Sequence, residues 1–201
     1  MGFTIGGTRR RGRTAECTAV AEYTGLWGWD VAPGARIAGG HCSCGAKSCP
    51  APGAHPLGPD IPAGATLDDV TKAWSDGAAV LLPVGRTFDI LDVTETAGSR
   101  ALVRLERMGL PLGPVLATPE GRALFFVAPG ACAQLPELLY RMGWDDADLD
   151  LRCLGPGARV PAPPSGPARW LRPPTLDTAQ PPQARLLLGT LAYITHRSQA
   201  G

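Results

Sequence analysis

Three cysteines and a histidine lie close together in one short segment, and all four carry atoms that bind soft metal ions. The segment runs from residue 41 to 56, and its four ligand-type residues are Cys42, Cys44, Cys49 and His55. Glycine and proline are too frequent here for a helix or strand, so a loop can wrap these side chains around one ion. The spacing predicts a structural zinc site, with His41 as a substitute for one ligand. The other interpretation is a loop with three free thiols, which would be prone to oxidation.

Two aspartates lie in segments that are predicted to be strands. Asp92 stands in the apolar segment 87–94, and Asp150 stands in the alternating segment 148–152. A carboxylate in an apolar strand is costly unless it is paired, hydrogen-bonded or bound to a metal. The carboxylate of Asp92 could therefore bind a metal ion. Alternatively, Asp92 is structural and accepts hydrogen bonds where its strand ends.

The hydrophobic patterns predict the elements that position these side chains. Apolar runs and alternation predict strands at 79–84, 87–94, 114–118, 122–128, 148–152 and 158–162. Helical periodicity predicts helices at 14–26, 67–75, 97–108, 134–142 and 183–197. Three pairs of strands look like hairpins, the first of them turning at Gly85-Arg86. These elements predict a two-layer α/β (α+β) fold with a mainly antiparallel central sheet.

Composition divides the chain into a main domain and two flanking segments. Residues 1–13 end in a run of arginines and are expected to form a flexible basic arm. The domain itself is expected to cover 14–172, with the zinc insert at 41–56. Residues 173–201 are expected to form a proline-rich linker and a C-terminal helix, and the stretch 161–182 is expected to lack regular structure.

The bulk numbers restrict the class of protein. With 201 residues the chain can bury a real core, and its net charge of +1 gives no global field toward nucleic acid. No apolar run reaches transmembrane length, so the expected location is the cytoplasm and no membrane partner is expected. In that compartment the six cysteines are expected to be thiols or metal ligands, with Cys17, Cys132 and Cys153 as non-ligands.

The order of several motifs resembles the primase–polymerase domain of the archaeo-eukaryotic primase superfamily, in its bacterial bifunctional DNA primase/polymerase form. The resemblance covers about residues 19–170. The matching segments are Gly28-Trp29-Asp30-Val31, the insert Cys42–Pro56, the helix Thr66–Trp74, the strand Phe88–Val93, Thr118–Phe126, Asp150-Leu151-Arg152, Gly155-x-Gly157 and Ala162-Pro163-Pro164-Ser165. It implies a primase–polymerase fold, with Asp92 and Asp150 as catalytic acids.

The resemblance also implies roles for arginines and exposes departures from the family pattern. Arg122, Arg152 and Arg159 are the implied nucleotide or phosphate ligands. The family pattern has a second acid where Thr94 stands and a histidine where Ala123 stands. Because two-metal nucleotidyl transfer needs enough carboxylate to hold two ions, these departures indicate weakened or lost catalysis.

Three hypotheses follow for the function. The first is a template-dependent nucleotidyltransferase that acts on nucleoside triphosphates and nucleic acid in DNA replication, with Mg²⁺ or Mn²⁺ at the acids. The second is an inactive relative on the same fold that binds nucleic acid or a protein partner. The third is a small zinc-stabilised protein whose acids are structural.

Overall fold

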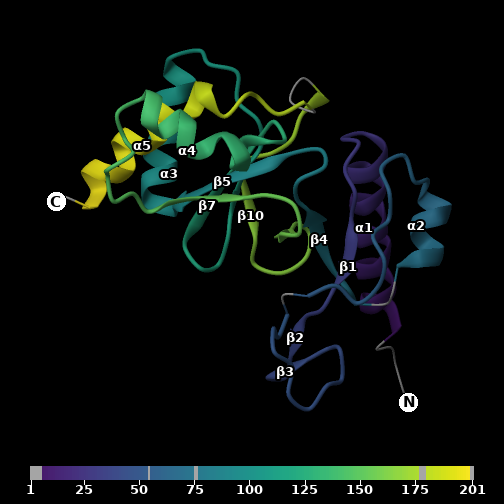
Figure 1. The fold of residues 1–201 in the computed structure, drawn as a ribbon. Coiled ribbons are helices and arrows are strands. Elements are labelled where there is room, and N and C mark those ends of the chain that lie inside the picture. Colours follow the sequence, from purple (N-terminus) through teal and green to yellow (C-terminus); the bar gives the residue numbers. More distant parts are fainter. Residues whose placement is uncertain (1–5, 54, 75–76, 177–179, 200–201) are drawn as a thin grey trace. The chain divides into compact units, whose positions relative to one another are not determined.

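The computed structural model describes residues 6–53, 55–74, 77–176 and 180–199, and it shows an α/β fold with antiparallel sheets (Figure 1). The chain forms two compact units. The first contains residues 1–83 together with 159–167, and the second contains 84–158 together with 168–201. The chain therefore leaves the first unit after residue 83 and returns to it for a single short segment.

The first unit is built on a small antiparallel sheet and two helices. The strands follow the order β1-β4-β9, and they are β1 (Ala32–Gly34), β4 (Ala79–Pro83) and β9 (Arg159–Ala162). The helices are α1 (Gly6–Gly25) and α2 (Leu67–Ala73), and a separate ribbon joins β2 (Ile37–Ala38) to β3 (His41–Cys42). Thr66 caps α2 in a capping box with Asp69, as its sequence predicts.

Helix α1 begins at Gly6, before the predicted start near residue 14. It therefore includes residues 6–13, for which the sequence predicted a flexible arm; residues 1–5 lie outside the described residues. The four arginines at 9–13 favour helix nearly as strongly as leucine does, and no proline interrupts the segment. Charge alone is therefore a poor guide to where this helix begins.

The second unit holds a five-stranded antiparallel sheet in the order β10-β6-β7-β5-β8. Its strands are β5 (Asp89–Thr94), β6 (Val115–Ala117), β7 (Arg122–Val127), β8 (Leu151–Leu154) and β10 (Arg169–Arg172). Its helices are α3 (Glu95–Arg107), α4 (Ala131–Arg141) and α5 (Arg185–Gln199). Strand β5 lies between β7 and the edge strand β8.

The two faces of β5 serve different purposes. Leu91 and Val93 belong to the core that includes Leu105 of α3 and Leu188 of α5. Because side chains alternate along a strand, Asp92 lies on the other face, away from this helical core. This alternation decides which side chains can meet Asp92.

The predicted central sheet is divided between the two units. Strand β4 does not form a hairpin with β5 across Gly85; it pairs with β1 and β9 instead. Likewise β8 pairs with β5 and β9 with β4, so the third predicted hairpin is absent, whereas β6 and β7 do pair as predicted. Pro83 ends β4 without an N–H to donate, and the N–H of Gly85 closes a local turn by donating to the carbonyl of Phe88.

The proline-rich stretch 161–182 is more regular than predicted. It contains the end of β9, which pairs with β4, and the whole of β10, which pairs with β6. Proline is tolerated in a strand when its missing N–H falls at an edge, and β9 and β10 are both edge strands. No helix in the described part of the chain is long and apolar enough to span a membrane.

Candidate functional site

The Cys/His loop, residues 41–56, brings its four predicted ligands together. One ligand atom from each of Cys42, Cys44, Cys49 and His55 lies within 4.8 Å of the others. The Sγ atom of Cys42 is 3.4 Å from Nε2 of His55. Atoms this close can all reach one ion, and the set of three sulfurs and one nitrogen suits a soft metal. The loop can therefore hold a metal ion.

Electrostatics within the loop favour a charged thiolate beside a protonated imidazole. Backbone N–H groups of Cys44 and Gly53, followed by His55, lower the pKa of Cys42 to about 6. The hydrogen bond with Cys42, followed by the carbonyl of Pro56, raises the pKa of His55 to about 9. Loss of hydration raises the pKa of Cys49. A cation that displaces the imidazole proton would meet a thiolate already stabilised by the backbone.

His41 does not join the four ligands. It is exposed, and its Nδ1 lies 3.0 Å from the carbonyl oxygen of Gly39. Cys17 is a buried free thiol in α1. These positions leave the set of Cys42, Cys44, Cys49 and His55 as the group that the structure gathers.

Arg122 joins the two predicted acids in the second unit. Its Nε donates to Oδ1 of Asp92 at 2.7 Å, and its Nη1 donates to Oδ2 of Asp150 at 2.7 Å. Asp92 lies in the centre of β5, and Arg122 begins the neighbouring strand β7. The side chains of Asp92 and Arg122 are 9% and 15% exposed, so this ion pair is largely removed from water. A guanidinium therefore lies between the two carboxylates.

Arg152 adds a second, more exposed cation to this cluster. It lies directly opposite Asp92 on β8, with its Nε 3.9 Å from Oδ2 of Asp92 and its Nη2 4.0 Å from Oδ1 of Asp150. Its side chain is 65% exposed. Two carboxylates thus face two guanidinium groups, and the formal charges of the cluster cancel. Arg159 belongs to the first unit, where it pairs with Asp60 at 3.2 Å.

The ionisation of the cluster follows from these hydrogen bonds. The bond donated by Arg122 lowers the pKa of Asp150 more than partial burial raises it. The bond to Asp150, ahead of the bond to Asp92, raises the pKa of Arg122. Asp150 is therefore ionised at neutral pH and bound to an arginine that remains charged.

Two residues that follow Asp92 along the chain, Thr94 and Glu95, have structural partners. The hydroxyl of Thr94 accepts from the backbone N–H of Ala97 and so caps α3. Glu95, the neighbouring acid, forms an ion pair with Arg169 on β10. Neither side chain adds a free carboxylate to Asp92.

Ala123 lies on the face of β7 that is turned toward the helices. Ala123 pairs with Val93 in the sheet and is fully buried. A Cβ built on Gly98 of α3 would lie 2.3 Å from the Cβ of Ala123, so Ala123 faces the helices. Arg122, Leu124 and Phe126, not Ala123, are the residues of β7 whose alternation puts them on the face of Asp92.

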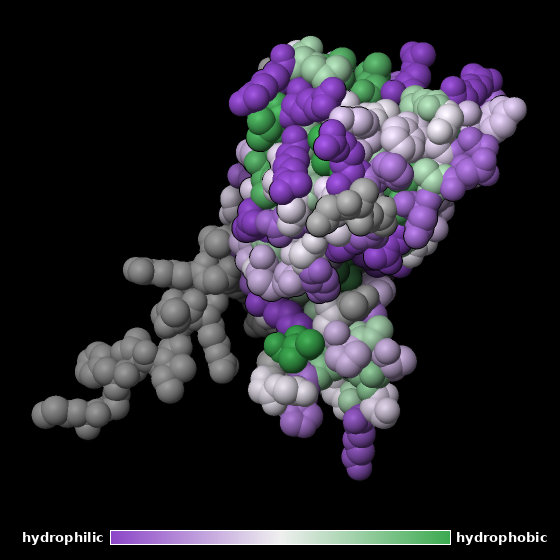
Figure 2. All heavy atoms as spheres, turned by 90° about the vertical axis from the view of Figure 1, so that its left-hand side faces the viewer, coloured by the Kyte–Doolittle hydropathy of each residue, from purple (hydrophilic) through white to green (hydrophobic). Residues whose placement is uncertain are grey.

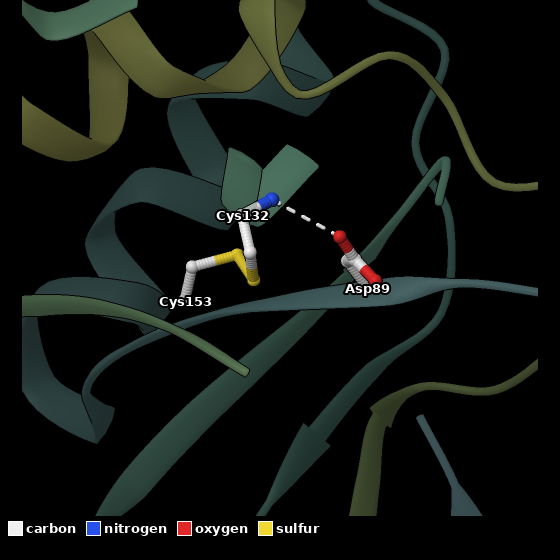
Figure 3. Close-up of a disulfide and its surroundings, with 3 residues drawn as sticks. All are labelled: Asp89, Cys132 and Cys153. Carbon is white, nitrogen blue, oxygen red and sulfur yellow. Dashed lines mark hydrogen bonds between the residues drawn. A yellow bond between two sulfur atoms is a disulfide. The ribbon is translucent and has the colours of Figure 1, made fainter. Parts of the chain in front are cut away.

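A third group of potential ligands, Asp89, Cys132 and Cys153, was missed by the sequence reasoning. Cys132 and Cys153 form a disulfide, which corrects the expectation that all six cysteines are thiols or ligands. Asp89 is fully buried beside it, and Oδ2 of Asp89 accepts from the N–H of Cys132 at 3.0 Å, in the first turn of α4 (Figure 3). Oδ1 of Asp89 has no hydrogen-bond partner in the described residues. The two cysteines are 21 residues apart in the sequence, one in a helix and one in a strand, so no local pattern indicated that they pair.

Comparison with known families gives one match. The model described as bifunctional DNA primase/polymerase, N-terminal, matches residues 20–184. Comparison with curated proteins and with solved structures gave no significant match. The matched region contains the Cys/His loop, both acids and Arg122, and it covers most of the described chain. The chain therefore belongs to the family of the N-terminal domain of bifunctional DNA primase/polymerases.

Proposed function

We propose that this primase/polymerase-like domain binds nucleotides and nucleic acid but transfers nucleotides weakly or not at all. The observation that carries the proposal is the position of Arg122, whose guanidinium donates to both Asp92 and Asp150. Divalent cations in nucleotidyl transfer need carboxylate oxygens that are free to coordinate them. In this chain a fixed protein cation already uses one oxygen of each acid.

The surroundings of the acids offer no replacement among the described residues. Thr94 is engaged in capping α3, and Glu95 is paired with Arg169. A metal ion would have to displace Arg122, break its two 2.7 Å hydrogen bonds and leave a partly buried guanidinium without partners. The remaining oxygens of the acids could hold one ion together with phosphates and water, which is fewer than a two-metal mechanism uses.

Binding of nucleotides can persist without catalysis because a second cation is accessible. Arg152 is 65% exposed and lies within 4.0 Å of both acids, so its guanidinium is available to a phosphate group from solvent. Nucleoside triphosphates and nucleic acid are the proposed partners at this cluster. Because nucleoside triphosphates are cytoplasmic, we assign the domain to the cytoplasm. Arg159, which pairs with Asp60, is a weaker candidate for the same role.

We also propose that the Cys/His loop binds a structural zinc ion. The donor set is three sulfurs and one nitrogen, which matches structural zinc sites, and all four atoms lie within 4.8 Å. With four protein ligands no position remains for water or substrate. The ion would therefore stabilise the loop and take no part in catalysis.

A template-dependent primer-extension assay with Mg²⁺ and, separately, Mn²⁺ tests the proposed loss of catalysis. We expect little or no extension by the 201-residue chain. The same protein should bind a labelled nucleoside triphosphate, and Arg152→Gln should weaken that binding. Robust extension that disappears in Asp92→Ala would overturn the proposal.

Replacement of Arg122 tests directly whether its guanidinium keeps a metal ion from the two acids. In Arg122→Gln the two acids lose the cation that is hydrogen-bonded to both of them, so Mn²⁺ should bind more tightly than it does to the native chain, as measured by electron paramagnetic resonance. Arg141→Gln, which removes an exposed arginine from α4, is the matched control and should leave Mn²⁺ binding unchanged. Equal Mn²⁺ binding by the native chain and Arg122→Gln would show that the guanidinium does not exclude the ion.

A regulatory module without catalysis is the alternative on the same fold. Its partner would be nucleic acid or another protein, and its acids would serve only to hold Arg122 in place. Nucleotide binding discriminates the two: a module of this kind need not bind a nucleoside triphosphate, whereas a weakened enzyme must.

A further inference from the structure

A run of arginines on α3 meets an exposed tyrosine on α5. Arg100, Arg104 and Arg107 stand at positions i, i+4 and i+7 of α3 and are exposed along one side of the helix. Tyr193 and Arg197 stand one turn apart on α5, and both are exposed. These five residues form the arginine–tyrosine face.

The aromatic ring on this face lies close to two guanidinium groups. Cζ of Arg104 lies 5.3 Å from the centroid of the Tyr193 ring, and Cζ of Arg197 lies 6.0 Å from it. Nη1 of Arg197 also donates to the hydroxyl of Tyr193 at 3.2 Å, which lowers the pKa of Tyr193. These contacts link α3 to α5 and keep planar cationic and aromatic groups together at the surface.

Acidic side chains do not neutralise this face. Helix α5 contains no aspartate or glutamate, and the two glutamates of α3 are paired with β10: Glu95 with Arg169, and Glu106 with Arg172. Within the described residues, none of the four arginines of the face forms an ion pair. In Figure 2, which is turned so that the side carrying α3 and α5 faces the viewer, long hydrophilic side chains alternate with hydrophobic ones.

An apolar side chain lies within the basic run. Val103 stands between Arg100 and Arg107 on α3 and is 48% exposed. Like charges that are neighbours on a helix repel each other, which is unfavourable. An anionic partner would offset the repulsion among these four arginines. The combination of phosphate-binding guanidiniums, an aromatic ring and an apolar side chain matches the needs of a flexible polyanion that carries planar bases.

We propose that the arginine–tyrosine face binds single-stranded nucleic acid. Its arginines would contact phosphates, and Tyr193 with its two guanidiniums would provide a stacking platform for a base. The face lies on the helical side of the second unit, and the helices cover the sheet face opposite Asp92. It is therefore a surface separate from the acid cluster and does not depend on nucleotidyl transfer.

Fluorescence anisotropy with a labelled single-stranded DNA oligonucleotide tests this surface on the full chain. The double variant Arg100→Gln/Arg107→Gln should lower affinity roughly tenfold, and the salt dependence of log K should fall by about 1.4 for two lost phosphate contacts. The matched control is Lys72→Gln/Arg141→Gln, which also removes two exposed cations, each from an i, i+4 pair on another helix. The control should keep native affinity.

The role of the ring is tested separately. Tyr193→Leu should lower affinity about fivefold or more without changing the salt dependence, whereas Tyr193→Phe keeps the ring and should bind nearly as well as the native chain. The substitutions leave Asp92, Arg122 and Asp150 unchanged, so extension and triphosphate-binding assays judge the proposed function independently.

Three results would overturn the proposal. One is unchanged affinity in the arginine double variant or equal loss in its control. Another is a fall in melting temperature without a fall in affinity, which would assign the arginines to stabilising the ends of α3 and α5. The third is binding to phosphatidylserine vesicles but not to the oligonucleotide, which would identify a membrane surface as the partner.

Discussion

The Cys/His loop and the acid cluster both gather metal-binding side chains, but they differ in what neutralises the charge. In the loop, one ligand atom from each of four residues lies within 4.8 Å of the others, and the only cation among them is a histidine that can release its proton. In the acid cluster, Arg122 donates to both aspartates and cannot release its proton. A group of ligands is therefore available to a metal ion only when its internal counter-ion can leave.

The largest expected effect is loss of the metal from the loop. Cys44→Ser should reduce the bound zinc from near one equivalent to almost none and should lower the melting temperature strongly. Metal-binding free energy becomes folding free energy, on the order of 10 kcal/mol in small zinc domains. Elemental analysis and thermal unfolding measure the two effects.

The adjacent histidine provides the control for that variant. His41→Ala removes an exposed imidazole that lies next to Cys42 but outside the four ligands. It should keep both the metal and the melting temperature. If the native chain purifies without bound zinc and with three reactive thiols in the loop, the loop is not a metal site, and its contrast with the acid cluster is refuted.

The next largest effect is expected when one aspartate leaves Arg122 with an incomplete pair. Asp92→Asn should lower the free energy of unfolding by about 3 kcal/mol, because a mostly buried guanidinium loses the less exposed of its two carboxylate partners. Asp150→Asn should cost about 1 kcal/mol, since the side chain of Asp150 is 34% exposed and water replaces much of the interaction. Urea unfolding measures both, and equal costs would show that burial does not rank the two acids.

Reduction of the disulfide should have an effect of similar or slightly smaller size. Cys132 and Cys153 are 21 residues apart, and opening a loop of that length typically costs about 3 kcal/mol. Cys132→Ser should reproduce the loss seen with dithiothreitol, and the variant should be insensitive to the reductant. If the reductant instead destabilises Cys132→Ser as much as the native chain, the disulfide is not the group that responds.

The smallest expected effect is a pH dependence from Asp150. Its pKa is lowered in the folded protein by the bond from Arg122, so this contribution to stability is complete above the ordinary carboxyl pKa near 4 and is lost as pH falls through the lower folded value. In Arg122→Gln this part of the loss of stability at low pH should be absent. Asp69, whose pKa the hydrogen bonds of the α2 cap also lower, titrates in the same range and should be unaffected by that substitution.

The sequence predicted features that depend on neighbouring residues better than features that depend on distant pairing. The ligand set of the Cys/His loop, the capping box of α2 and the β6–β7 hairpin were all predicted from short segments. The division of the strands between two sheets and the disulfide were missed, because both join segments far apart in the chain. Arg122 was predicted to bind phosphate, and only the register of β5, β7 and β8 shows that it lies between two acids.

The capping role of Thr94 has a consequence for how this domain could change over time. Strand β5 ends at Thr94 and α3 begins at the next residue, so position 94 must supply the oxygen that accepts from Ala97. Aspartate is at least as good an N-cap as threonine, and one of its two oxygens would remain free. Thr94→Asp would therefore return a carboxylate to the strand beside Arg122, its cross-strand neighbour, without weakening the helix. Exchange of threonine and aspartate at position 94 during evolution would therefore not be opposed by a loss of helix stability.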